Sequence, residues 1–220
     1  MNRIAEFRGF ILLAGLMVTV GGTAFAQETR TIAPTTLEAL LSAPHVTPST
    51  GAMHGDVTLV EYFDYNCPFC RALEPELRKL AASDPGLRVI RKDWPIFGDA
   101  SVFAAYCSFA AAHEGKYEVA HDALITSKRN LHSRADVLSV LGAAGLDIAE
   151  IQKDVAQHEK EYADILARSR QEAQSLGLRG TPGIIVGNEL VLGGADYRQL
   201  QDIIAGVRQT QSSSRHSRRQ

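Results

Sequence analysis

The sequence predicts an α/β domain in which a small mixed central sheet is flanked by helices and a helical subdomain is inserted. The order of the hydrophobic patterns supports this: β-α-β, then a long helical block, then β-β-α. The composition agrees, because 45% hydrophobic and 22% charged residues among 220 are typical of one globular domain. Disordered, fibrous and multi-span membrane proteins are thereby excluded.

The first 26 residues have the features of a secretory signal peptide. Arg3 and Arg8 give a basic start, Gly9–Val20 is an apolar run, and Ala24–Ala26 supplies a small-x-small cleavage pattern. The alternative is an uncleaved anchor, but the run is shorter than the about 20 apolar residues that cross a bilayer. We expect cleavage after about Ala26 and export to a compartment where disulfides persist.

The next elements form a β-α-β unit behind a lead-in segment. Residues 27–56 are rich in Thr, Pro and Ser, and only Leu37–Leu41 predicts a helical turn. Val57–Phe63 is β-branched and aromatic, which predicts a buried strand. Leucines at helical spacing predict a helix over Cys67–Ala82, and Leu87–Lys92 is the second strand.

The inserted helical subdomain is expected at about residues 99–176, within a domain spanning 57–208. Apolar side chains recur there at helical spacing, and turn signals divide the segment into several helices. The last of them, Glu150–Ala173, is long and highly charged, as expected of a helix with a solvated face.

The β pattern then returns and the chain closes with a helix. Gly183–Val186 and Glu189–Leu192 flank Gly187-Asn188, a two-residue turn that predicts a hairpin. A helix is expected over Tyr197–Val207, and residues 209–220, rich in Gln, Ser and Arg, are expected to form a disordered tail.

The charge balance limits the partners. A formal net charge of -2 and a pI of about 6.4 provide no global basic field, so we expect no nucleic acid partner. Three cysteines are too few for a small scaffold held together by disulfides.

The chemistry is expected at Cys67-Pro68-Phe69-Cys70. An i, i+3 spacing at a helix start places both cysteines on one face. Unpaired N–H groups and the helix dipole favour a thiolate there, so Cys67 is predicted to be the exposed nucleophile of low pKa. Cys70 is expected to be the buried resolving thiol. Pro68 suits the first helical turn, where no backbone N–H is needed.

The segment Glu61–Arg71 resembles the active-site segment of thioredoxin-fold oxidoreductases of the DsbA type, and the resemblance extends from about Val57 to Val207. It implies a thioredoxin fold and thiol–disulfide exchange with cysteines of exported proteins, most simply their oxidation. It also implies a periplasmic location and reoxidation by a membrane redox partner.

The resemblance implies further site residues. Thr181-Pro182 matches the Thr-Pro before the third thioredoxin strand, where the proline is cis and the loop faces the dithiol. The residue before that proline offers backbone groups to a bound peptide, with Pro68 and Phe69 beside it. Glu61 matches a buried strand acid that exchanges a proton with Cys70, unless it merely faces outward from an edge strand.

Two departures leave the direction of exchange open. Phe69 stands where the prototype oxidant has His, and it can neither donate a hydrogen bond nor carry charge. Thr181 is more similar to the residue found in disulfide isomerases and copper-tolerance relatives. A periplasmic isomerase or reductase, or a protein that binds Cu(I) through its thiolates, is therefore the alternative. Without a long N-terminal dimerisation domain, a monomer is expected.

No cofactor or metal is expected. Cys107 lies in an apolar helical stretch, where a buried spare thiol is the simplest interpretation and a redox or metal role the alternative. His113, His121 and His132 occur in the helical block without an HxxxH motif or a second CxxC. They form no closed set of the four ligands typical of structural zinc.

Overall fold

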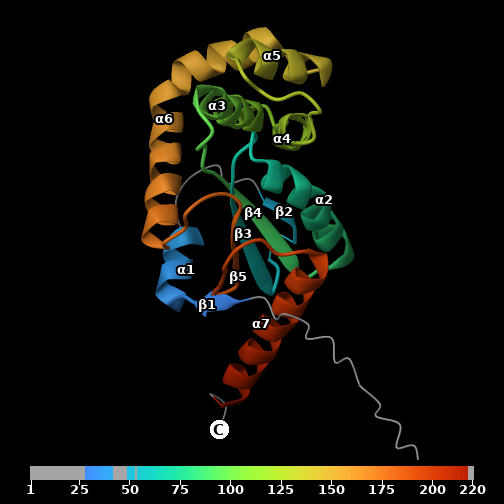
Figure 1. The fold of residues 1–220 in the computed structure, drawn as a ribbon, viewed down its shortest axis with the longest axis vertical. Helices are drawn as coiled ribbons and strands as arrows, with labels where there is room; N and C mark the ends of the chain where they lie inside the picture. The colour runs from blue at the N-terminus through green and yellow to red at the C-terminus, as the bar shows by residue number, and fades with distance from the viewer. Residues whose placement is uncertain (1–27, 42–48, 53, 218–220) are drawn as a thin grey trace, which may run out of the picture.

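The computed structural model describes residues 28–41, 49–52 and 54–217. Its centre is a six-stranded mixed sheet in the order β1-β6-β5-β3-β4-β2 (Figure 1). The strands are β1 (Thr29–Thr31), β2 (Ser49–Gly51), β3 (Val57–Phe63), β4 (Leu87–Asp93), β5 (Gly183–Val186) and β6 (Glu189–Val191). The helices are α1 (Pro34–Leu41), α2 (Pro68–Ser83), α3 (Asp99–His113), α4 (Tyr117–Ile125), α5 (Arg134–Ala143), α6 (Ile148–Ser175) and α7 (Tyr197–Ser217).

The sheet has the mixed pairing expected of the β-α-β and β-β-α halves. β3 and β4 are parallel and joined through α2, whereas β5 lies antiparallel to β3 and β6 antiparallel to β5. Gly187 turns the β5–β6 hairpin with φ of 58°, and a Cβ there would lie 2.7 Å from the side chain of Val207. Glycine meets both conditions because it lacks that atom.

Apolar side chains cover both faces of the sheet. One cluster joins the sheet to α2 and α7 through residues such as Leu59, Leu77 and Leu200. A second joins the opposite face to α1 and the end of α6 through Leu40, Ala173 and others. β3 alternates between these clusters, because successive strand side chains point to opposite faces.

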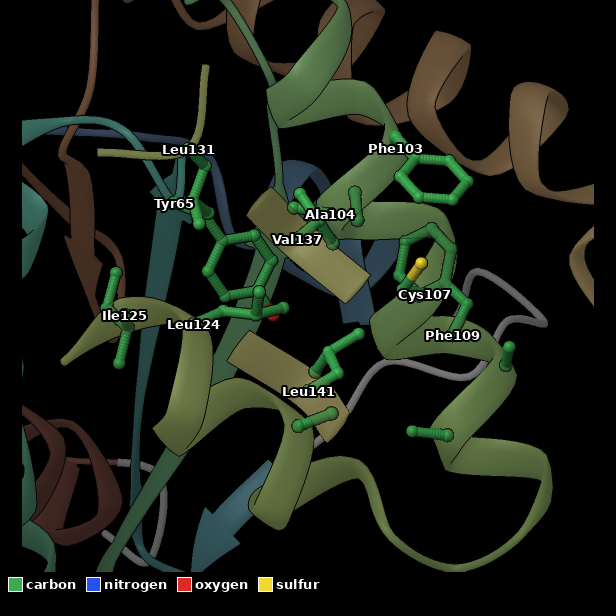
Figure 2. Packing of buried hydrophobic residues seen from close by; sticks show 14 of the residues in the cluster. Tyr65, Phe103, Ala104, Cys107, Phe109, Leu124, Ile125, Leu131, Val137 and Leu141 are labelled. Carbon is green, nitrogen blue, oxygen red and sulfur yellow. The ribbon is translucent and has the colours of Figure 1, made fainter. Parts of the chain in front are cut away.

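A third cluster lies in the helical subdomain, where α3 packs against α4, α5 and α6 (Figure 2). Phe109, Leu124 and Leu141 come from three different helices and are almost fully buried. Figure 1 places this subdomain at one end of the sheet, next to the start of α2. Cys107 is completely buried among these side chains, as a spare thiol was expected to be.

The lead-in segment contributes more structure than the single predicted turn. β1 pairs with β6 and β2 pairs with β4, so this segment supplies both edge strands of the sheet. Its alternation was too short to detect, because each strand has three residues. The expected signal peptide, residues 1–26, lies outside the described residues.

Two helices differ from their predicted lengths. α7 continues to Ser217, which corrects the expected helix end at Val207 and the disordered tail from 209 as far as Ser217. Serine and threonine hydroxyls there bond to carbonyls four residues earlier, as Ser213 does with Gln209. α6 covers the predicted long helix, but His158 interrupts it with non-helical angles of φ -114° and ψ 15°.

Candidate active site

Cys67 occupies the junction between the central strand β3 and α2. It is the N-cap residue of α2, with extended backbone angles of φ -70° and ψ 117°. The backbone N–H of Cys70 points at Cys67 Sγ over 3.4 Å. Pro68 fills the first helical position, where a missing N–H costs no helical hydrogen bond. The helix start therefore presents its free amides to the sulfur, as the sequence predicts.

The two sulfurs have opposite acidities. A hydrogen bond from the Cys70 thiol lowers the pKa of Cys67 to about 6. The N–H groups of Phe69 and Cys70 act in the same direction, whereas partial burial opposes the shift. Burial, the hydrogen bond to Cys67 and the charge of Glu61 raise the pKa of Cys70 far above that of a free thiol. Near neutral pH the pair therefore holds one thiolate and one thiol.

Cys67 is not the exposed residue that the sequence predicts: it is 0% exposed. The backbone carbonyl of Thr181 lies 3.1 Å from its sulfur, on a loop 114 positions later in the chain. This contact and the packing against the helical subdomain both come from residues far away in the chain, so local sequence could not show the burial of Cys67. Phe69, by contrast, is 73% exposed beside the dithiol.

The Thr181–Pro182 peptide bond is cis, as the resemblance implies. Thr181, Pro182 and Phe69 line a pocket of about 620 Å³ together with Leu178 from the loop before β5 and Leu192 from the loop after β6. The pocket opens next to the Cys67 sulfur, because the Thr181 carbonyl contacts that atom. Its lining combines apolar side chains with glycine-rich loop backbone, which suits an extended polypeptide.

Glu61 lies on β3, an interior strand of the sheet, which rules out the edge position that the sequence left open. Its side chain is 2% exposed and lies on the α2 side of the sheet. Burial raises the pKa of Glu61 to about 8. The positive charge of Arg91 opposes this shift, and the negative charges of Glu74 and Cys67 add to it. At neutral pH the Glu61 carboxyl is therefore mostly protonated. When it ionises, its negative charge raises the pKa of the Cys70 thiol.

Asp64 and Asn66 shape the turn before the cysteines and were not identified from the sequence. Asp64 accepts hydrogen bonds from the backbone N–H groups of Asn66, Ile96 and Phe97 at 2.7–2.9 Å. Its carboxylate thus joins the CxxC turn to the loop after β4. A polar residue between a buried strand and a CxxC motif was the available signal.

Asp93, at the end of β4, is buried and was not identified from the sequence as a site residue. Its carboxyl is 3% exposed, and burial together with the charge of Asp64 raises its pKa well above the usual value. β3 and β4 run parallel with Phe63 opposite Asp93, so this acid lies at the same end of the sheet as the cysteines. Only the strand pairing shows that proximity.

The model of the DSBA-like thioredoxin domain family matches residues 58–205 of the chain. A solved thioredoxin-like oxidoreductase from Silicibacter pomeroyi DSS-3 is 38% identical, with a TM-score of 0.73 over 78% of this chain and 97% of that chain. A periplasmic thioredoxin-like protein from Salmonella enterica serovar Typhimurium is 29% identical, with a TM-score of 0.67 over 80% of this chain and 98% of its own.

The thiol-disulfide exchange protein alpha-DsbA2 from Wolbachia pipientis shares the fold, with 24% identity and a TM-score of 0.71 over 79% of this chain and 95% of that chain. Curated relatives are longer. The Na(+)/H(+) antiporter NhaA 3 of Salinispora tropica is 28% identical over 138 residues, which are 62% of this chain and 21% of the relative.

The antiporter NhaA 1 of Mycolicibacterium vanbaalenii is 27% identical over 193 residues, which are 84% of this chain and 31% of the relative. The chain therefore spans about a fifth to a third of the length of these relatives. Among the described residues, no helix combines the length and the apolar character that a membrane crossing requires.

Proposed function

The chain belongs to the DSBA-like thioredoxin domain family, and from this premise we propose that it oxidises cysteine pairs of exported proteins. The observation that carries the proposal is the acidity of the dithiol, with a pKa of about 6 for Cys67 and a strongly raised pKa for Cys70. A stabilised thiolate favours the reduced form of the enzyme, which makes its disulfide an oxidant.

The reaction is a two-electron thiol–disulfide exchange between the Cys67–Cys70 disulfide and a pair of substrate thiols. A substrate thiolate attacks Cys67 Sγ of the Cys67–Cys70 disulfide, and a mixed disulfide forms while Cys70 leaves as a thiolate. The second substrate thiolate then attacks the substrate sulfur of the mixed disulfide and releases Cys67 as a thiolate. The substrate gains a disulfide, and the enzyme retains two electrons.

Glu61 would supply the proton that Cys70 needs in the first step. With a pKa of about 8, this carboxyl holds a proton at neutral pH and gives it up when the Cys70 thiolate appears. In reoxidation the same carboxylate would accept the proton of Cys70. Both sides of this transfer are buried, so solvent competes poorly for the proton.

Thr181, Pro182, Pro68 and Phe69 would hold the substrate. An extended segment that lies in the 620 Å³ pocket can pair with the backbone at Thr181, as an added strand does. The exposed ring of Phe69 then offers apolar contact to residues near the substrate cysteine. The Thr181 carbonyl must exchange its contact with Cys67 for one with the substrate.

The cellular setting belongs to the same proposal. The chain would be exported to the periplasm with cleavage after about Ala26, act as a monomer, and be reoxidised by a membrane redox partner. Its domain would comprise residues 57–208 with the helical insertion at about 99–176, preceded by the lead-in 27–56.

The reduction potential of the Cys67–Cys70 pair, equilibrated against glutathione, tests the direction of exchange. A value near about -120 mV is expected of a strong oxidant. A value near about -270 mV would contradict the oxidase function and favour a reductase or isomerase.

Substitution of each cysteine tests the mechanism. Cys70→Ser should accumulate mixed disulfides with substrate, whereas Cys67→Ser should not. Full exchange activity of Cys67→Ser would contradict the mechanism.

A further inference from the structure

Three side chains that could hold a metal ion meet in the helical subdomain, in elements separate from the dithiol. His113 is the last residue of α3, and Asp154 and His158 lie one turn apart on α6. One ligand atom from each residue lies within 4.8 Å of the other two. In Figure 1, α6 curves around α3, and the two helices pack against each other.

The distances fit a small metal ion. The Nδ1 atoms of His113 and His158 lie 3.1 Å and 3.3 Å from Asp154 Oδ2. Ligand atoms placed about 2.0–2.1 Å from a tetrahedral zinc ion are about 3.3 Å from one another. The side chains are 32%, 17% and 29% exposed for His113, Asp154 and His158, so an ion can enter from solvent.

A neighbouring tyrosine orients the carboxylate. The hydroxyl of Tyr162 donates a hydrogen bond to Asp154 Oδ1, which leaves Oδ2 facing the two imidazoles. Hydrogen bonds from outside the ligand set commonly orient metal ligands in this way.

We propose that His113, Asp154 and His158 bind one divalent transition-metal ion of the zinc class. Two imidazole nitrogens favour zinc and its transition-metal neighbours over calcium or magnesium, which prefer oxygen ligands. With three protein ligands, the fourth position is open to water. The ion would tie the end of α3 to α6 where His158 interrupts the helix.

Zinc titration by calorimetry tests the site, with the Cys67–Cys70 pair oxidised to the disulfide so that its thiolates cannot bind the ion. We expect one zinc ion per chain. His113→Gln and Asp154→Asn should each weaken binding at least about tenfold. The matched control is His132→Gln, which changes an exposed histidine of the same subdomain and should leave binding unchanged.

Cobalt(II) added to the oxidised wild-type protein gives a second measurement, which does not depend on whether the substituted proteins fold. A tetrahedral visible spectrum without sulfur charge-transfer bands is expected of nitrogen and oxygen ligands. Absence of zinc binding by the wild type, a sulfur-type cobalt spectrum, or equal affinities of wild type, His113→Gln and Asp154→Asn would overturn the proposal.

Discussion

Cys67 and Cys70 are identical side chains three positions apart, yet their environments separate their pKa values widely. Cys67 receives hydrogen bonds at the start of α2, and its pKa falls to about 6. Cys70 is buried one turn into the helix beside Glu61, and burial raises its pKa. In the proposed function, this asymmetry makes the first sulfur the point of attack by substrate and the second the partner in proton exchange.

Alkylation measures this asymmetry directly. In the reduced protein, the rate of alkylation of Cys67 by iodoacetamide should rise with a midpoint near pH 6, because only the thiolate reacts. Cys67→Ser should lack this phase, since the raised pKa values of Cys70 and Cys107 keep both thiols protonated near pH 6. A midpoint near the ordinary thiol value of 9 would contradict the proposed activation.

Because of its raised pKa, Glu61 should make the folded protein less stable against unfolding as the pH rises. The pKa of Glu61 is about 8 in the folded protein, whereas the ordinary value for glutamate, expected in the unfolded chain, is 4.5. Between pH 4.5 and 8 the folded state therefore binds a proton that the unfolded state lacks. The free energy of unfolding therefore falls with rising pH, by at most about 1.4 kcal/mol per pH unit.

Glu61→Gln should remove that slope between pH 4.5 and 8 in urea unfolding of the oxidised protein, where the two thiols do not titrate. The matched control is Glu159→Gln on an exposed face of α6, which should keep the wild-type slope. An unchanged slope in Glu61→Gln would show that Glu61 is ionised normally.

At the scale of elements, the turn before α2 is held by the helical subdomain. The Asn66 amide donates to Ser101 Oγ at 3.0 Å and to the Leu131 carbonyl at 2.9 Å, and accepts from the Leu131 N–H at 3.0 Å. Arg71 donates to the carbonyls of Tyr65 and Ser127, each at 2.6 Å. The insertion thus positions the cysteines as well as covering them.

Asn66→Ala should destabilise the protein by about 1–3 kcal/mol, because its loss leaves the Leu131 backbone groups without these partners. Urea unfolding measures the change, and disulfide exchange should slow in the same variant. Asn130→Ala, at an exposed position of the neighbouring loop, is the control. Equal stability of the two variants would contradict a positioning role for Asn66.

At the scale of the whole molecule, a buried ionic network joins the sheet, α2 and the subdomain. Glu74 Oε1 on α2 accepts from Arg91 on β4 at 2.8 Å, and Glu74 Oε2 lies 3.3 Å from His121 Nε2 on α4. Burial opposes the effect, but His121 and Arg91 lower the pKa of Glu74 to about 2. The carboxylate is therefore ionised inside the protein.

Arg91→Met should destabilise the protein by up to about 3–5 kcal/mol, because Glu74 then loses its fully buried counter-charge and keeps only the partly exposed Arg78. The double variant Glu74→Met/Arg91→Met should recover part of that loss, since neither charge remains. Thermal and urea unfolding compare the two. A double variant as unstable as the sum of the single variants would show that the two side chains act independently.

Local signals in the sequence were enough to predict several elements. Strand composition, helical spacing and the hairpin glycine predicted β3, α2, β4 and the β5–β6 hairpin, and the CxxC position predicted a helix start at Cys67. The resemblance of Glu61–Arg71 and Thr181-Pro182 predicted the thioredoxin fold and the cis bond, which are both confirmed. These features lie within a few residues of their own signals.

Contacts between distant segments could be seen only in the folded chain. The Thr181 carbonyl that covers Cys67, the edge strands of the lead-in segment, and Glu61 on an interior strand all arise from pairings between distant segments. His113 and Asp154 are 41 positions apart and belong to no common sequence motif. The packing of α3 against α6 nevertheless places His113 Nδ1 3.1 Å from Asp154 Oδ2. Periodicity specifies which face of an element is buried, whereas the partner of that face depends on how the whole chain packs.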